Sequence, residues 1–185
     1  MNTSSVPNVP AARQGLLFGD TLVDQDDDLG YRGPVACAAA GITYRQLDYW
    51  ARTGLLQPSV RAARGSGSQR LYSFKDILVL KIVKKLLDAG VSLQQVRTAV
   101  TQMHNRGVED LSSITLMSDG ASVYECTSTE EVIDLLQGGQ GVFGIAVGRV
   151  CREVEGSLAD LPVEQAELSV VDDLAERRRM KRSVS

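Results

Sequence analysis

Histidine and cysteine are scarce in this 185-residue chain, which contains one histidine and three cysteines. The cysteines, Cys37, Cys126 and Cys151, are far apart in the sequence, and no C-x-x-C pair occurs. A disulfide framework or a zinc knuckle is not expected, because both need sets of suitably spaced thiols. His104 is the single histidine and adds no cluster. We therefore predict buried reduced thiols, with no bound metal and no cofactor.

Long apolar runs are also absent, and the run at 77–80 is far too short to cross a bilayer. No basic residue precedes an apolar core near the N-terminus, so a secretory signal is not predicted. The composition, 43% hydrophobic and 23% charged, is typical of a globular protein. We expect a cytoplasmic protein with no membrane segment.

A catalytic constellation is missing as well. Glu130, Glu131 and Asp134 share one short predicted helix, where acidic side chains are usually solvated. The segment 139–144 fits G-x-G-x-x-G, but it follows a predicted helix and leads into a strand. A dinucleotide site needs the opposite order. The sequence therefore predicts a protein that is not an enzyme.

Charge is distributed unevenly along the chain, although the net charge is only −3. Residues 31–106 contain twelve lysines or arginines and three aspartates, a net charge of +9. Residues 107–161 contain two arginines and ten acidic residues, a net charge of −8. A basic segment beside an acidic one indicates a nucleic-acid-binding module joined to another unit.

Within the basic segment the pattern predicts a winged helix-turn-helix. A short helix over 35–40 is followed by Gly41 for a turn, and Thr43 caps a second helix. The segment 61–72 reads as a β-hairpin with a Gly/Ser/Arg tip. Two further helices open at Ser73 and Ser92, each three residues before a side chain that can complete a cap.

After Gly107 the pattern changes to a β-hairpin over 114–126, a helix over 128–136, a strand over 142–147 and a last helix over 150–161. The predicted fold class is mainly α with small β elements, an N-terminal winged helix-turn-helix plus a small α+β C-terminal domain. The predicted divisions are a disordered acidic arm (1–30), a DNA-binding domain (31–106), an acidic domain (107–161) and a polar tail with a basic end (162–185).

Three motifs in order resemble the MerR family. Residues 41–56, GITYRQLDYWARTGLL, resemble its helix-turn-helix, and residues 67–76, GSQRLYSFKD, resemble its wing. Residues 88–93, DAGVSL, resemble the turn that follows. The longer stretch is similar to the branch named for ResR and McdR, regulators linked to growth and cell division.

The resemblance implies a transcription regulator that binds double-stranded DNA as a homodimer, with RNA polymerase as a candidate partner and the effector unknown. An α-helix fits the major groove with its first residues at the base edges, and flexible arginine-rich wings suit the backbone and minor groove. The predicted DNA-binding residues are Thr43, Tyr44, Arg45, Tyr49, Arg52, Arg61, Arg64, Arg70 and Tyr72.

Two departures from the family pattern stand out. Asp48 occupies the place of an arginine before the aromatic pair, which would lose or move a phosphate contact. The helix after Ser92 ends near Arg106, shorter than the helix through which many MerR proteins dimerise. Dimerisation is therefore expected in the acidic domain.

Two apolar stripes in the acidic domain are the predicted self-association surface: Val142, Phe143, Ile145 and Val147, and Val150, Val154 and Leu158. Part of this apolar surface could instead line a pocket for an unknown effector, and closure of the stripes within one small core is the other alternative. A different function also stays open, a protein-interaction adaptor in which the acidic domain recruits a partner and DNA binding is secondary.

Overall fold

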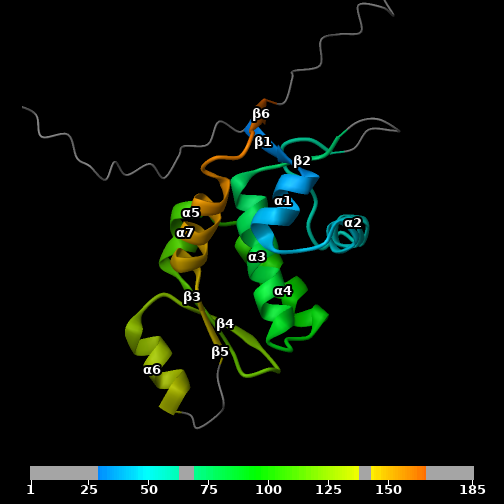
Figure 1. Ribbon diagram of the computed structural model, residues 1–185. Helices are drawn as coiled ribbons and strands as arrows, with labels where there is room; N and C mark the ends of the chain where they lie inside the picture. Colours follow the sequence, from blue (N-terminus) through cyan, green and yellow to red (C-terminus); the bar gives the residue numbers. More distant parts are fainter. Residues whose placement is uncertain (1–28, 63–68, 138–142, 166–185) are drawn as a thin grey trace, which may run out of the picture.

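The computed structural model describes residues 29–62, 69–137 and 143–165, and Figure 1 shows their path. Most of these residues are helical, with short strands between the helices, which confirms the predicted fold class. The elements in chain order are β1 (Leu29–Arg32), α1 (Gly33–Ala40), α2 (Tyr44–Arg52), β2 (Leu71–Tyr72), α3 (Phe74–Asp88), α4 (Leu93–His104), α5 (Val108–Ser113), β3 (Thr115–Ser118), β4 (Val123–Cys126), α6 (Thr129–Gln137), β5 (Phe143–Ala146), α7 (Val147–Leu158) and β6 (Glu164–Gln165).

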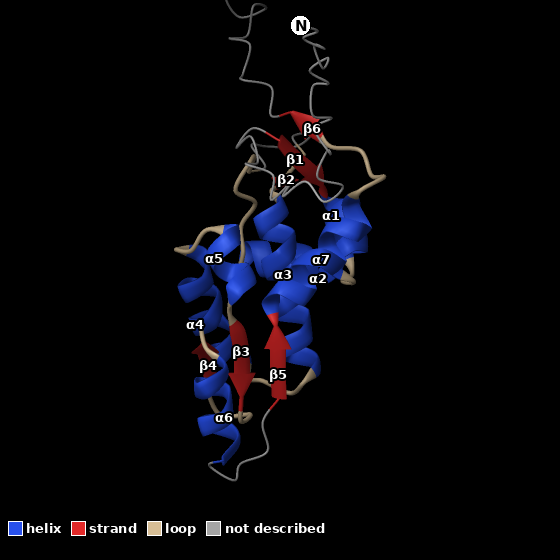
Figure 2. Cartoon of the chain, turned by 90° about the vertical axis from the view of Figure 1, so that its left-hand side faces the viewer, coloured by secondary structure: helices blue, strands red, loops and turns tan. Residues whose placement is uncertain are grey.

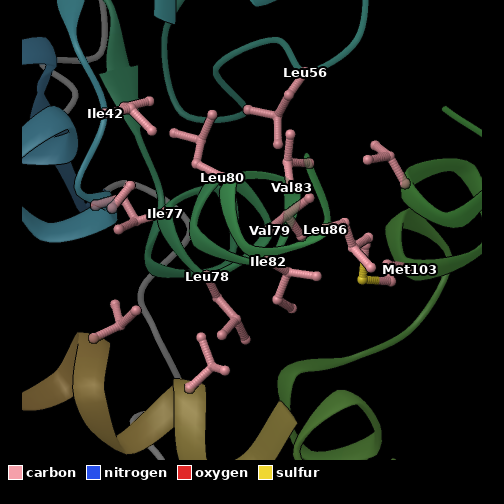
Figure 3. Packing of buried hydrophobic residues seen from close by; sticks show 14 of the residues in the cluster. Ile42, Leu56, Ile77, Leu78, Val79, Leu80, Ile82, Val83, Leu86 and Met103 are labelled. Atoms are coloured by element: carbon pink, nitrogen blue, oxygen red, sulfur yellow. The ribbon is translucent and has the colours of Figure 1, made fainter. Parts of the chain in front are cut away.

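Helix α3 forms the centre of the molecule. It begins at a reciprocal cap, in which Ser73 Oγ accepts a hydrogen bond from Asp76 N at 3.1 Å and Asp76 Oδ2 accepts one from Ser73 N at 3.0 Å. Its apolar side chains are buried around most of its circumference, and Figure 3 shows them directed to several sides of the helix. A helix that is apolar all round must be covered by other elements. Helices α1, α4 and α7 provide that cover.

Helix α7 completes the core of the N-terminal segment. Val147, Val150, Val154 and Leu158 are buried in the same hydrophobic cluster as the side chains of α3. Lys81 and Lys85 of α3 add ion pairs to Glu153, with Nζ–Oε2 distances of 3.8 and 3.4 Å. The prediction that these α7 side chains form a self-association surface is therefore wrong. They close within the monomer, because α3 offers an apolar face that would otherwise meet water.

Two three-stranded antiparallel sheets lie at opposite ends of the molecule (Figure 2). In one, β1 is the central strand, with Tyr31 opposite Tyr72 of β2 and Leu29 opposite Gln165 of β6. In the other, β3 lies between β4 and β5, and Leu116 faces Ile145. The first sheet therefore connects β2, at the base of the wing, to β1 and β6, the first and last strands of the described residues.

Most elements agree with the sequence predictions, and three were not predicted: β1, α5 and β6. The wing hairpin is present at its base, where the main chains of Arg61 and Leu71 exchange hydrogen bonds of 3.2 and 2.9 Å. Its tip at 63–68, the predicted arm up to residue 28 and the tail from residue 166 lie outside the described residues. The boundary predicted between residues 106 and 107 stays a prediction, although buried side chains on both sides share one cluster.

Candidate nucleic-acid interface

The turn before α2 presents this helix to the surface. Gly41 adopts a left-handed conformation with φ of 72°, and its N–H donates to Cys37 O at 2.9 Å. Thr43 then caps α2, since Thr43 Oγ1 accepts from Gln46 N at 3.2 Å and Gln46 Oε1 accepts from Thr43 N at 2.9 Å. This cap and turn fix the direction of the helix without using its exposed face.

One face of α2 is buried and the other is open. Leu47 and Trp50 pack into the core, whereas Tyr44, Arg45 and Tyr49 are exposed. Arg52, in the last turn, is also exposed. The structure therefore brings five predicted site residues, Thr43 among them, onto or beside one open helical face. An exposed first turn with an arginine and a tyrosine has the geometry of a helix that reads base edges.

The base of the wing is fixed to the start of α3 by a buried carboxylate. Besides capping α3, Asp76 Oδ2 accepts hydrogen bonds from the N–H and the hydroxyl of Ser59, both at 2.8 Å. The Ser59 hydroxyl also lies 2.9 Å from Ser73 Oγ. The sequence predicted the Ser73–Asp76 cap but not the contact with Ser59. Ser59 and Asp76 are 17 residues apart, so no local pattern links them.

Asp76→Ala should lower the free energy of unfolding by about 2–4 kcal/mol, because it removes a cap and leaves the partly buried N–H groups of Ser59 and Ser73 without this partner. Urea denaturation measures the change. The matched control is Asp110→Ala, which removes an exposed aspartate from α5 and should cost less than about 0.5 kcal/mol. Equal losses in the two variants would contradict the anchoring role.

The predicted wing residues occupy different environments. Arg61 is half-buried, and its Nε donates to Gln69 O at 3.1 Å. Arg70 is half-buried beside α2, where it forms an ion pair with Asp48. Arg64 lies outside the described residues. The wing base thus places the Arg70 guanidinium beside α2, where it pairs with Asp48, the residue at which the sequence departs from the family pattern.

Tyr72 is the predicted site residue that the fold removes from the surface. Its side chain is fully buried in the core cluster. Burial raises the pKa of its hydroxyl to about 12, so the group stays protonated at neutral pH. A side chain without exposed surface offers no atom to DNA, and we leave Tyr72 out of the proposed interface. The position of Tyr72 in the wing motif is explained by the packing of β2 against α3.

Comparison with known proteins places this geometry in a family. The family model for the MerR HTH family regulatory protein matches residues 31–103, from β1 into α4. An HTH-type transcriptional regulator of Mycobacterium tuberculosis, named as uncharacterized, is 63% identical over 168 residues, which cover 88% of this chain and 74% of the relative. The chain belongs to the MerR family. It is a helix-turn-helix transcriptional regulator.

More distant MerR relatives match the N-terminal part. HmrR of Sinorhizobium medicae is 26% identical over 83 residues, covering 44% of this chain and 54% of the relative. The heavy metal-dependent transcription regulator 1 of Rhizobium meliloti is 27% identical over 74 residues, covering 40% and 48%. The metal named for the latter is a property of that protein.

Within the described parts of this MerR protein, no group of three His, Cys, Asp or Glu side chains could hold a metal ion. The three cysteines are buried free thiols. Burial raises the pKa of Cys151 to about 11, so it is a protonated thiol at neutral pH and a poor ligand. In the same described ranges, no helix is long and apolar enough to cross a membrane.

Helix α4 of this MerR protein ends at His104, close to the predicted end, and the chain then turns into the short α5. Arg97 of α4 donates to Thr53 O at 3.1 Å, so α4 supports the C-terminal end of the recognition helix. Arg106 forms an ion pair with Glu125 of β4 at 2.6 Å. The residues after α4 thus pack back on the same molecule and do not continue the helix.

Proposed function

We propose that the protein binds promoter DNA sequence-specifically as a homodimer, with α2 in the major groove and the wing against the backbone. The observation that carries this proposal is the open face of α2, with Tyr44 and Arg45 in its first turn and a fixed wing base beside it. Footprinting of the purified protein on genomic fragments tests it. Genes of growth and division are the first targets to examine, given the similarity to the ResR and McdR branch.

Dimerisation would use the distal end of the molecule. Helix α6 has no buried residue, and its Ile133 and Leu136 side chains are 45% and 51% exposed. Tyr124 of β4, a strand that contacts α6, adds an exposed aromatic ring. Phe143 of β5 is exposed on the opposite face of that sheet, because it lies opposite Ser118 whereas Tyr124 lies opposite Met117. Figures 1 and 2 both show α6 at the end opposite to β1, β2 and β6. Exposed apolar side chains on one helix are typical of an interaction surface, and a contact through α6 would leave the face of α2 free.

The double variant Ile133→Gln/Leu136→Gln should weaken self-association about ten-fold or more, since both side chains leave water only in the dimer. Sedimentation over a concentration series measures the dissociation constant. Val163→Gln is the control, because Val163 is another exposed apolar residue, near β6. Equal dissociation constants for the two variants would place the dimer contact elsewhere.

A protein-interaction adaptor is the second candidate function, and the same helix favours it. Glu130, Glu131 and Asp134 lie on α6 beside the exposed apolar residues, a combination that suits a basic partner protein. Under this alternative the α6 double variant loses a bound partner while the protein still dimerises. Absence of a footprint together with a retained pull-down would favour the adaptor over the regulator that contacts DNA.

A further inference from the structure

Asp48 lies on the recognition helix and holds two arginines at once. Its Oδ2 atom is 2.8 Å from Arg52 Nη2, one turn further along α2. Its Oδ1 atom is 3.0 Å from Arg70 Nη1, which comes from the wing side, 22 residues away. This single carboxylate is therefore a direct side-chain link between the helix and the wing.

The two contacts differ in how much solvent reaches them. The side chains of Asp48 and Arg70 are 26% and 24% exposed, whereas Arg52 is 74% exposed. An exposed ion pair between flexible side chains contributes little, because water screens it and ordering costs entropy. A half-buried hydrogen-bonded pair fixes its partners more firmly. The Asp48–Arg70 contact is thus the one that links the helix to the wing firmly, and Arg52 is the more exposed partner of the same carboxylate.

A carboxylate on this face opposes DNA binding by charge alone, since the phosphates are negative. Asp48 offsets that cost only if it improves the geometry of the interface. It occupies one N–H donor of Arg70, and a guanidinium has five. The other N–H donors of Arg70 are then held in a fixed position beside α2. Arg70 is no longer free to bind whichever phosphate is nearest.

We propose that Asp48 is a positioning residue that joins the recognition helix to the wing and raises discrimination between operator and other DNA while lowering affinity for DNA in general. The proposal rests on the proposed function, because it requires that α2 and the wing both face DNA. It assigns a role to the residue at which this chain departs from the MerR pattern.

The test is Asp48→Asn, which keeps the shape of the side chain and removes its charge. Binding of the full chain to its footprinted operator and to an unrelated duplex of equal length is measured over a salt series. We expect the variant to bind the unrelated duplex about ten-fold more tightly, with a salt slope steeper by about one. Operator affinity changes less, so the ratio of the two dissociation constants falls.

Asp88→Asn is the matched control, because it makes the same charge change at the exposed end of α3. It should shift both dissociation constants by one common factor and leave their ratio unchanged. If Asp48→Asn also leaves the ratio unchanged, Asp48 acts as a charge only and the proposal is overturned. If the wild-type protein itself does not prefer any footprinted site, the proposed function fails instead.

A second variant approaches the same contact from the wing. Arg70→Gln should also lower the ratio, but with weaker binding to both duplexes, because a cation is lost. In the Arg70→Gln background, adding Asp48→Asn should no longer change the ratio, since the contact is already broken. A further fall of the same size as in the wild-type background would overturn the proposal. If Asp48→Asn does not fold, Arg70→Gln alone tests the proposal. An unchanged ratio of the two dissociation constants in Arg70→Gln would then overturn it.

Discussion

Val154→Asp should unfold the described structure and abolish DNA binding, although Val154 lies on α7, the last helix among the described residues. Its side chain has no exposed surface and belongs to the cluster that surrounds α3. Burying an unpaired carboxylate costs several kcal/mol, which is a large part of the roughly 5–15 kcal/mol that stabilise a domain. Circular dichroism during heating and a gel shift on the operator measure the two losses.

Ser157→Asp, on the exposed side of the same helix, is the control for this charge. It should melt within a few degrees of the wild-type protein, because surface substitutions usually change stability by less than about 0.5 kcal/mol. Wild-type melting of the Val154 variant would show that α7 is separable from the helix-turn-helix, which contradicts the packing of α7 on α1 and α3.

Arg45→Ala should relax the sequence preference of the protein. Arg45 is exposed in the first turn of α2, where a helix in the major groove meets base edges. Loss of a good base-edge contact is worth about 1–3 kcal/mol of discrimination, on the order of 10- to 100-fold at the base pair concerned. Competition between the operator and singly substituted operators measures this, and one base pair should lose its effect.

Arg149→Ala supplies the comparison, because Arg149 is an exposed arginine on α7 rather than on α2. It should leave the ranking of the substituted operators unchanged. A full wild-type ranking for the Arg45 variant would show that another residue reads the bases, and Tyr44, its neighbour in the same turn, would be examined next.

The caps and turns were predictable because each depends on a few neighbouring residues. Thr43 caps α2 as predicted, and Ser73 with Asp76 forms the reciprocal cap that its spacing predicts. The return hydrogen bond from Thr43 N to Gln46 was not predicted. Gly41 and Gly90 adopt the left-handed conformation expected at helix ends. The face of α2 followed from the same reasoning, since the buried positions recur at helical spacing.

Long-range partners were beyond the sequence. The apolar stripe of α7 was visible, but periodicity does not say which surface covers it, and α3 rather than a second molecule does so. Tyr72 fitted the wing motif, yet its burial depends on strand β1, whose pairing partners lie far away in the chain. Asp48 had no visible partner for the same reason, because Arg70 is brought to it only by the fold.

The position of α7 has a consequence for synthesis of the protein on the ribosome. When residue 106 has been made, α3 still lacks the side chains that will cover one of its faces. The next 52 or so residues take on the order of 3–10 s to add at ~5–20 residues per second. During that interval this face of α3 cannot be covered by α7, its partner in the folded protein. Strand β6 pairs with β1 only after that, so the sheet beside the helix-turn-helix is completed after α7, although β1 precedes α7 in the chain.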